Sequence, residues 1–118
     1  MVKVLIADDA AFMRMKSATL VRELGYDVFE AADGAEAVVL YRHHHPDAVL
    51  MDITMPVMDG LEALTQILAA YPDAKIAMVT ALGQQQVIME AIRRGAKDFV
   101  VKPFDAERIE SALWKLVG

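Results

Sequence analysis

Apolar residues follow two alternating patterns along the chain. Short, almost continuously apolar runs are typical of strands buried on both faces, whereas apolar residues that recur every three or four positions are typical of helices. Strands are predicted over residues 2–7, 27–31, 48–51, 75–80 and 98–101. Helices are predicted over residues 11–24, 35–44, 61–71, 84–94 and 105–117. Gly25, Pro46, Pro72 and Gly95 fall between these segments, as expected of residues that end helices.

The apolar positions of three helices define the faces expected to pack on the sheet. In the first helix these positions are Phe12, Met15, Leu20 and Leu24. In the fourth helix they are Val87, Ile88, Ala91 and Ile92, and in the fifth they are Ile109, Leu113 and Leu116.

The regular alternation of strand and helix predicts an α/β fold. Such a pattern builds a doubly wound, five-stranded parallel sheet covered by five helices on its two faces. Right-handed crossovers leave few topologies. Rossmann-type and flavodoxin-like strand orders both remain open, although a sheet of five strands favours the flavodoxin-like order. The length of 118 residues predicts one domain, over residues 1–118.

Polar residues close four of the predicted strands. Asp8 and Asp9 follow the first strand, Asp52 follows the third, Thr80 ends the fourth and Lys102 follows the fifth. The carboxyl ends of parallel strands lie at one edge of the sheet, where α/β proteins bind ligands. In the flavodoxin-like order the first and third strands are neighbours, so that Asp8, Asp9 and Asp52 would share one crevice.

Three carboxylates in one crevice repel one another. Two unit charges about 4.5 Å apart cost on the order of 4 kcal/mol at an effective dielectric constant of about 20. A hard cation relieves this repulsion, and a site with few carboxylates suits Mg²⁺ better than Ca²⁺. The chain has no cysteine, and these loops have no histidine, so zinc is not expected.

An aspartate beside a metal, an ammonium and a hydroxyl is an arrangement suited to phosphoryl transfer. The carboxylate can accept the phosphoryl group, while the cations neutralise its oxygens. Asp52 is the best-placed acceptor, with Lys102 and Thr80 beside it. Each residue also has a structural interpretation: Asp9 can cap the first helix, Asp8 can favour its dipole, and Thr80 and Lys102 can be ordinary strand ends.

Composition excludes several other classes of function. The formal net charge of -5 argues against nonspecific nucleic-acid binding. No apolar run reaches the length of a membrane span, and the start of the chain lacks a signal-peptide core, so no membrane partner is expected. Together with the lack of cysteine, this predicts a cytoplasmic protein. The three consecutive histidines at 43–45 do not share a helix face and are not expected to bind a metal.

The residues at the strand ends resemble the motifs of a known family. Asp8-Asp9, Asp52 with Met55-Pro56, Thr80-Ala81 and Lys102-Pro103-Phe104 are similar to the motifs of response-regulator receiver domains, at matching spacing over residues 2–117. Residues 8–14, 51–56, 83–85 and 96–99 are most similar to the single-domain chemotaxis receivers. The resemblance implies the strand order 2-1-3-4-5 and a single receiver domain over residues 1–118.

The resemblance also implies a role for each residue of the crevice. Asp52 would accept a phosphoryl group from a histidine kinase of a two-component system. Asp9, Asp52 and the backbone carbonyl of Thr54 would bind Mg²⁺ directly, and Asp8 would bind it through water. The phosphoryl oxygens would contact Thr80, Lys102 and the backbone of Thr54 and Ala81.

The same resemblance implies a conformational switch. Thr80 would move toward the phosphoryl group, Phe99 would turn inward, and the surface of the fourth helix, fifth strand and fifth helix would change. The Lys102–Pro103 peptide would be cis. The best known members of the family have tyrosine where this chain has Phe99, which has no hydroxyl to bond outward, so the inward rotamer is expected to be less costly here. An apolar Leu82 beside the path of the hydrolytic water predicts slow self-dephosphorylation.

The implied partners are a chemotaxis-type histidine kinase and a target such as the flagellar motor switch protein. The protein would assist its own phosphorylation and dephosphorylation without being a turnover enzyme. The segment 95–99 differs from that of receivers that dimerise through the fifth strand, so a monomer is expected.

Three alternatives remain open. The chain could be the receiver module of a longer regulator with another output. A Mg²⁺-dependent phosphatase of the haloacid-dehalogenase kind would need a second aspartate two residues after its nucleophile, where this chain has Thr54. A flavin or nucleotide binder would need phosphate-binding donors in the first loop, where Asp8 and Asp9 would repel phosphate.

Overall fold

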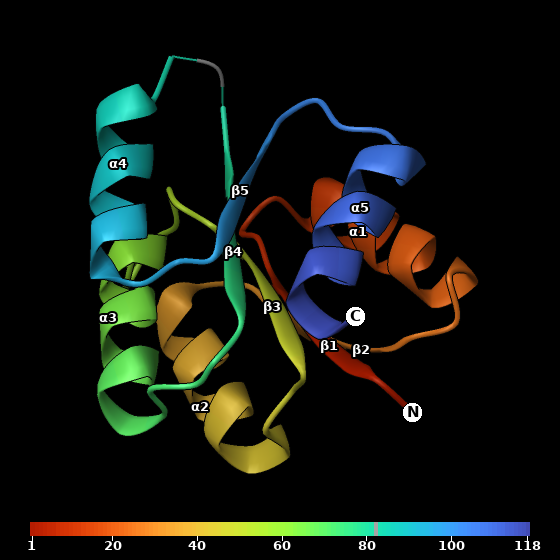
Figure 1. The fold of residues 1–118 in the computed structure, drawn as a ribbon, viewed down its shortest axis with the longest axis horizontal. Helices are drawn as coiled ribbons and strands as arrows, with labels where there is room; N and C mark the ends of the chain where they lie inside the picture. Colours follow the sequence, from red (N-terminus) through yellow and green to blue (C-terminus); the bar gives the residue numbers. More distant parts are fainter. Residues whose placement is uncertain (82) are drawn as a thin grey trace.

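Strands and helices alternate along the chain in the computed structural model, which describes residues 1–81 and 83–118 (Figure 1). The elements are β1 (Lys3–Ala7), α1 (Ala11–Glu23), β2 (Asp27–Ala31), α2 (Gly34–His44), β3 (Ala48–Asp52), α3 (Gly60–Ala70), β4 (Ile76–Thr80), α4 (Gln85–Arg94), β5 (Asp98–Val101) and α5 (Ala106–Val117). Every predicted element forms, and each boundary falls within one residue of its predicted position.

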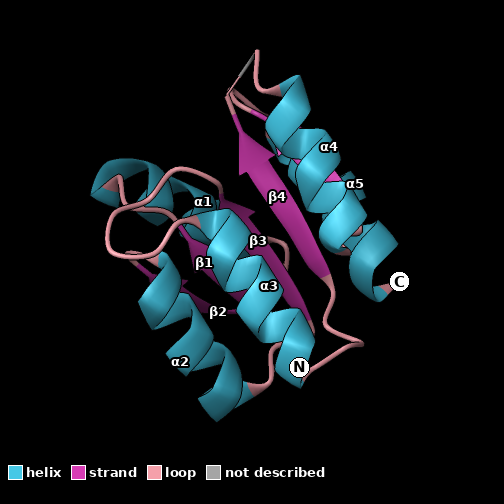
Figure 2. Ribbon diagram, turned by 90° about the vertical axis from the view of Figure 1, so that its left-hand side faces the viewer, coloured by secondary structure: helices cyan, strands magenta, loops and turns pink. Residues whose placement is uncertain are grey.

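The strands form one parallel sheet in the order β2-β1-β3-β4-β5, which confirms the flavodoxin-like prediction. Helices α1 and α5 pack on one face, and α2, α3 and α4 cover the other (Figures 1 and 2). No helix in the described parts of the chain is long and apolar enough to cross a membrane.

Side chains of the central strands alternate between two cores. In β1, Leu5 packs toward α2 and α3, whereas Val4 and Ile6 pack toward α1 and α5. In β3, Met51 and Leu50 divide in the same way. Because both faces of these strands are buried, the sheet fixes the positions of the residues that follow it at its carboxyl edge.

Aspartate side chains begin three of the helices. Asp33, Asp59 and Asp105 are the N-caps of α2, α3 and α5, and each accepts a hydrogen bond from the backbone N–H three residues on. Such caps satisfy N–H groups that have no partner inside the helix. Asp9 has no such role, because the N-cap of α1 is Ala10 and no side chain caps this helix.

Helix α1 turns a different face to the sheet from the one expected, and α4 departs at one position. In α1, Phe12 is 70% exposed and Met15 is 57% exposed, whereas Ser17, Ala18 and Val21 are buried. The small side chains at 17 and 18 allow the helix to lie close to the sheet. The larger apolar residues therefore point outward. The inward position predicted for Ile92 of α4 is also wrong, since its side chain is 44% exposed, but the buried stripe of α5 is confirmed.

Gly60 permits α3 to begin directly beneath Asp52. Its N–H donates to the carbonyl oxygen of Ile53 at 2.7 Å, and a Cβ at position 60 would lie 2.0 Å from the backbone oxygen of Asp52. We expect Gly60→Ala to lower the free energy of unfolding by about 3 kcal/mol, because the backbone must move to admit the methyl group. Thermal melting measures the effect.

Gly25→Ala is the matched comparison for this prediction. A Cβ at position 25 would meet nothing within 4 Å, so only the strain of its positive φ of 97° applies. This variant should lose about 1 kcal/mol. A Gly60→Ala protein that melts at or above the temperature of Gly25→Ala would contradict the close approach.

Candidate functional site

The register of the sheet brings the predicted carboxylates together. Ala7 of β1 pairs with Met51 of β3, so Asp8 and Asp52 follow at neighbouring positions of the carboxyl edge. Both side chains are buried, whereas Asp9 is exposed. Carboxylate oxygens of Asp8, Asp9 and Asp52 all lie within 4.8 Å of one another. The described residues thus contain the acidic crevice that the sequence predicted.

Lys102 joins two of these carboxylates. It follows β5, and its backbone N–H donates to the carbonyl oxygen of Thr80 at 2.7 Å, which extends the ladder beyond the last strand residues. Its Nζ lies 3.1 Å from Oδ2 of Asp52 and 3.3 Å from Oδ2 of Asp8. The Lys102–Pro103 peptide is cis. The ammonium group therefore lies between the two buried carboxylates.

Burial and charge shift the pKa values of this pair. Burial raises the pKa of the Asp52 carboxyl and the charge of Asp8 adds to this, so that together they outweigh the lowering effect of Lys102 and the Ile53 N–H. Burial alone would lower the pKa of Lys102, but Asp52 and Asp8 raise it above its ordinary value. Lys102 thus stays protonated at neutral pH, whereas the ionised form of Asp52 is less stable in the fold than in water.

Backbone and side-chain contacts hold Asp8 in place. Its Oδ1 accepts a hydrogen bond from the N–H of Ala10 at 2.9 Å, and its carbonyl oxygen accepts one from Nη1 of Arg14 at 2.8 Å. Arg14 also pairs with Glu30, with Nε 3.4 Å from Oε1. Sequence reasoning missed Arg14, because a single arginine on a helix gives no sign of which backbone oxygen it reaches.

The hydroxyl of Thr80 and the backbone N–H of Ala81 meet one side chain. Thr80 is buried at the end of β4, and its Oγ1 contacts Oε1 of Gln84 and lies 3.2 Å from the carbonyl oxygen of Ala81. The N–H of Ala81 donates to the same Oε1 of Gln84 at 3.1 Å. Sequence reasoning missed Gln84 as a contact, although a polar residue at the start of a helix was the available signal.

Phe99 and Thr54 lie nearer the surface. Phe99, on β5, is 38% exposed and lines a surface pocket of about 470 Å³ together with Ala81, Gln84 and Ile88. Thr54 is exposed in the loop that follows β3 directly after Asp52 and Ile53. The predicted role of Leu82 in slow dephosphorylation concerns a residue outside those that the structure describes.

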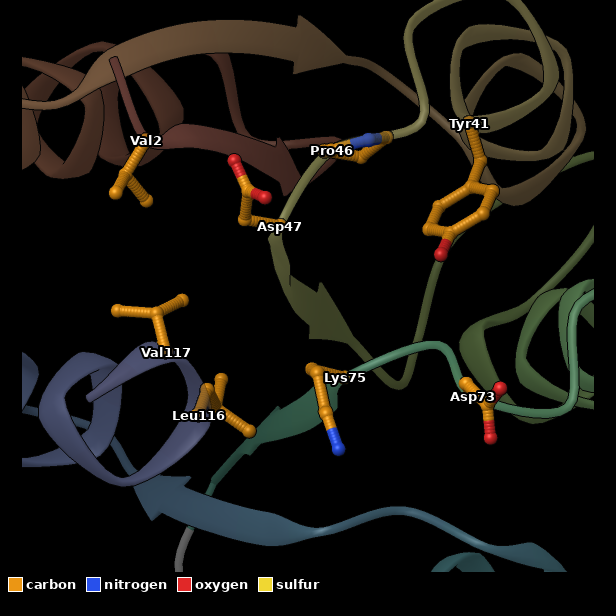
Figure 3. Close-up of a pocket in the computed structure, with 8 residues that line it drawn as sticks. All are labelled: Val2, Tyr41, Pro46, Asp47, Asp73, Lys75, Leu116 and Val117. Carbon is orange, nitrogen blue, oxygen red and sulfur yellow. The ribbon is translucent and has the colours of Figure 1, made fainter.

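A second pocket, of about 390 Å³, lies at the amino ends of the strands (Figure 3). Asp47, Asp73, Lys75 and the ring of Tyr41 line it beside apolar side chains. Burial, followed by the charges of Tyr71, Asp47 and Asp73, raises the pKa of Tyr41, so its hydroxyl stays neutral at physiological pH. Asp47 and Asp73 lie apart in this pocket, whereas the three close carboxylates of the described residues lie at the opposite edge, so the acidic crevice is the candidate site.

The crevice fits a small hard cation. Six oxygen ligands about 2.1 Å from Mg²⁺ lie roughly 3–4 Å from one another. The carboxylate oxygens within 4.8 Å of one another need to move inward only slightly to reach that spacing. The donor set consists of oxygen atoms alone, as Mg²⁺ requires, and Asp9 is open to solvent for an ion that keeps several waters.

The strand order and the acidic crevice place the chain in the class of receiver domains. The chain belongs to the response regulator receiver family, because residues 4–114 match the response regulator receiver domain. Members of this family are regulators rather than turnover enzymes, and they use Mg²⁺ at an acidic pocket.

The relatives narrow the class to receivers similar to the chemotaxis protein CheY. The chain is 53% identical over 116 residues to CheY of Listeria monocytogenes, which covers 98% of each chain. It is 50% identical over 115 residues to CheY of Thermotoga maritima, covering 97% of this chain and 96% of that one. A chain in the crystal structure of the CheX–CheY–BeF3–Mg²⁺ complex of Borrelia burgdorferi matches with a TM-score of 0.91 at 36% identity, covering 97% of this chain and 87% of that one. The predicted resemblance to chemotaxis receivers is confirmed.

Proposed function

We propose that this protein accepts a phosphoryl group on Asp52 from a histidine kinase and passes the signal on by binding a partner. The observation that carries the proposal is the junction of Asp52, Asp8 and Lys102 at the carboxyl edge of the sheet, with Nζ of Lys102 3.1 Å and 3.3 Å from the two carboxylates. A buried carboxylate with a raised pKa and a fixed cation beside it is typical of a reactive group.

In the proposed reaction a carboxylate oxygen of Asp52 attacks the phosphorus atom of a phosphohistidine. The new O–P bond forms as the P–N bond breaks, and the imidazole leaves with the electron pair of that bond. Lys102 neutralises negative charge on the oxygens of the transferred group, since its ammonium already contacts Asp52. Burial of Asp52 limits the access of water to the acceptor oxygen.

Asp8, Asp9, Asp52 and the backbone carbonyl of Thr54 are the residues that would hold Mg²⁺. The ion, when bound, neutralises charge on the phosphoryl oxygens and on the crowded carboxylates. Asp8 is positioned for this by Ala10 and Arg14. The exposure of Asp9 supports its role, because this carboxylate caps no helix and is open to the solvent.

We infer that phosphorylation changes the surface formed by α4, β5 and α5. Thr80, at the end of β4, would turn its hydroxyl toward a phosphoryl oxygen, and the N–H of Ala81 and the backbone of Thr54 would bind others. Phe99 would leave its half-exposed position in the pocket beside Ala81 and turn inward. A charge at Asp52 would thus bias a surface on the neighbouring strands.

The relatives named CheY support the partners that we propose. A chemotaxis-type histidine kinase would supply the phosphoryl group, and a target such as the flagellar motor switch protein would bind the changed surface. In the Borrelia structure CheY is in complex with CheX, which supports the expectation of further partners for this chain. The single domain over residues 1–118, the monomeric state and the cytoplasmic location stay predictions.

Incubation with acetyl phosphate tests the proposal. Intact mass should show a gain of one phosphoryl group that requires Mg²⁺ and is lost after a chelator is added beforehand. Borohydride reduction followed by tandem mass spectrometry should then place the modification on Asp52 and not on Asp8 or Asp9. Unmodified protein in the presence of Mg²⁺, or modification of another residue, would overturn the assignment.

A further inference from the structure

We propose that Gln84 is a positioning residue that occupies the phosphoryl-binding donors of Thr80 and Ala81 in the unphosphorylated protein, and thereby opposes phosphorylation of Asp52. The inference rests on the proposed function, because it concerns the same site. It adds a residue whose contacts with Thr80 and Ala81 stabilise the unphosphorylated state. These contacts must break before the two donors can bind the phosphoryl group.

One oxygen atom meets both donors. Oε1 of Gln84 accepts the N–H of Ala81 at 3.1 Å and contacts the hydroxyl of Thr80. These two groups follow each other at the end of β4, and their donors point to one spot beside the strand end. A phosphoryl oxygen is also an acceptor, so the side-chain oxygen of Gln84 offers them the same chemistry in the absence of a phosphoryl group.

Thr80 and Ala81 cannot donate to Gln84 and to a phosphoryl oxygen at the same time, because each of the two groups has a single proton. A hydroxyl has one proton to donate and a backbone amide has one. When Thr80 and Ala81 donate to Gln84, they have no proton left for an oxygen on Asp52. Phosphorylation therefore requires that the contacts of Gln84 break, and their free energy is subtracted from that of the new contacts.

The position of Gln84 in its helix supports this role. It is the N-cap of α4, where a polar side chain ordinarily accepts an N–H of its own helix, yet it makes no side-chain cap hydrogen bond. The side chain reaches back to the strand end instead. Gln84 and Phe99 line the same pocket, so release of Gln84 would alter the surface beside the proposed switch residue.

Two substitutions separate this role from a general effect on structure. Gln84→Met keeps the length of the side chain but removes the acceptor, so it should lower the half-saturating concentration of acetyl phosphate by about three- to tenfold. Gln84→Glu keeps an acceptor and adds a negative charge that strengthens the contacts and repels the phosphoryl group, so it should raise that concentration. Gln86→Met, at an exposed position of the same helix, is the matched control and should change nothing.

Amide exchange in the protein without phosphodonor tests the contact itself. The N–H of Ala81 should be protected from hydrogen exchange in the wild-type protein and in Gln84→Glu, and should lose that protection in Gln84→Met. An unprotected Ala81 amide in the wild type would overturn the inference whether or not the protein is phosphorylated. Protection that persists in Gln84→Met would do the same.

The outcomes distinguish this inference from the proposed function. A wild-type protein that takes up a phosphoryl group, with Gln84→Met and Gln84→Glu unchanged or shifted in the same direction, would overturn the role of Gln84 alone. A wild-type protein that takes up no phosphoryl group would overturn both. Opposite shifts of the two variants, with Mg²⁺ affinity in the absence of phosphodonor unchanged, would support the inference.

Discussion

Asp52→Asn is expected to end Mg²⁺-dependent phosphoryl uptake and, in the absence of metal, to raise the melting temperature at neutral pH. The first effect follows because an amide oxygen is a poor nucleophile and cannot form the acyl phosphate of Asp52. The second follows from burial and from the charge of Asp8, which raise the pKa of Asp52 and so make its ionised form costly in the fold. We expect a gain of about 1 kcal/mol, or roughly 3–6 °C, because Lys102 already offsets part of the repulsion.

The gain should depend on pH in a defined direction. The pKa of Asp52 is higher in the folded than in the unfolded protein, so its ionisation destabilises the fold above the folded pKa. As the pH falls through that value, the wild-type carboxyl takes up a proton in the fold and the cost disappears. The advantage of Asp52→Asn should therefore be full at neutral pH and vanish below the unfolded pKa of Asp, about 3.9.

Asp27→Asn is the matched control for this prediction. Asp27 is an exposed residue at the start of β2, and its replacement removes the same negative charge from the chain. The control should keep phosphoryl uptake and show no comparable gain in melting temperature. An equal gain in both variants would assign the effect to net charge, and a lower melting temperature of Asp52→Asn at neutral pH would contradict the crowded crevice.

The crevice could be predicted from the sequence because it depends on where the strands end and not on how individual side chains pack. Asp8, Asp52 and Lys102 each follow an apolar run too short for a helix, and parallel strands bring their carboxyl ends to one edge whatever the helices do. The strand order was needed only to predict that β1 and β3 are adjacent in the sheet. The pattern favoured that order and the family resemblance implied it, and the sheet confirms it.

Helix faces were harder to predict, because the size of a side chain does not by itself say where it points. Phe12 and Met15 have the spacing of a buried stripe, yet Ser17 and Ala18 take the sheet side of α1. The competing face is built from small residues, which hydrophobicity alone ranks below phenylalanine. The true stripe repeats at positions 17, 18 and 21, so an interpretation that weighted close helix–sheet packing would have favoured it.

The pattern of apolar and polar positions could not predict the contacts made by long polar side chains. Gln84 could have capped α4, faced the solvent or reached back to the strand, and the geometry of the turn decides among these. Gly60 presents the same difficulty. Only glycine fits there because a Cβ would collide with the backbone of Asp52, eight positions earlier in the chain. Such contacts depend on how separate elements approach one another, which composition and periodicity do not encode.

Lys102→Met is expected to have a large effect on the chemistry and an opposite effect on metal binding. Phosphoryl uptake from acetyl phosphate should fall by about 100-fold or more, because the substitution removes a cation that stabilises charge on the transferred group. Without metal the fold should lose about 1–3 kcal/mol, since Asp8 and Asp52 keep their charges and lose the ammonium that lies 3.3 Å and 3.1 Å from them. Both effects arise from one cation, whose charge the two carboxylates maintain by raising its pKa.

Mg²⁺ affinity separates loss of this charge from general damage to the site. The ammonium of Lys102 repels a divalent cation bound by the same carboxylates, so Lys102→Met should bind Mg²⁺ more tightly than the wild type, and Mg²⁺ should restore most of the lost stability. Lys97→Met, at an exposed position before β5, should change neither uptake nor Mg²⁺ affinity. Weaker Mg²⁺ binding by Lys102→Met would mean that the lysine organises the carboxylates instead of competing with the metal. Retained uptake would remove it from the chemistry. Tighter metal binding with lost uptake is the combination that only a cation shared between carboxylates and phosphoryl group produces.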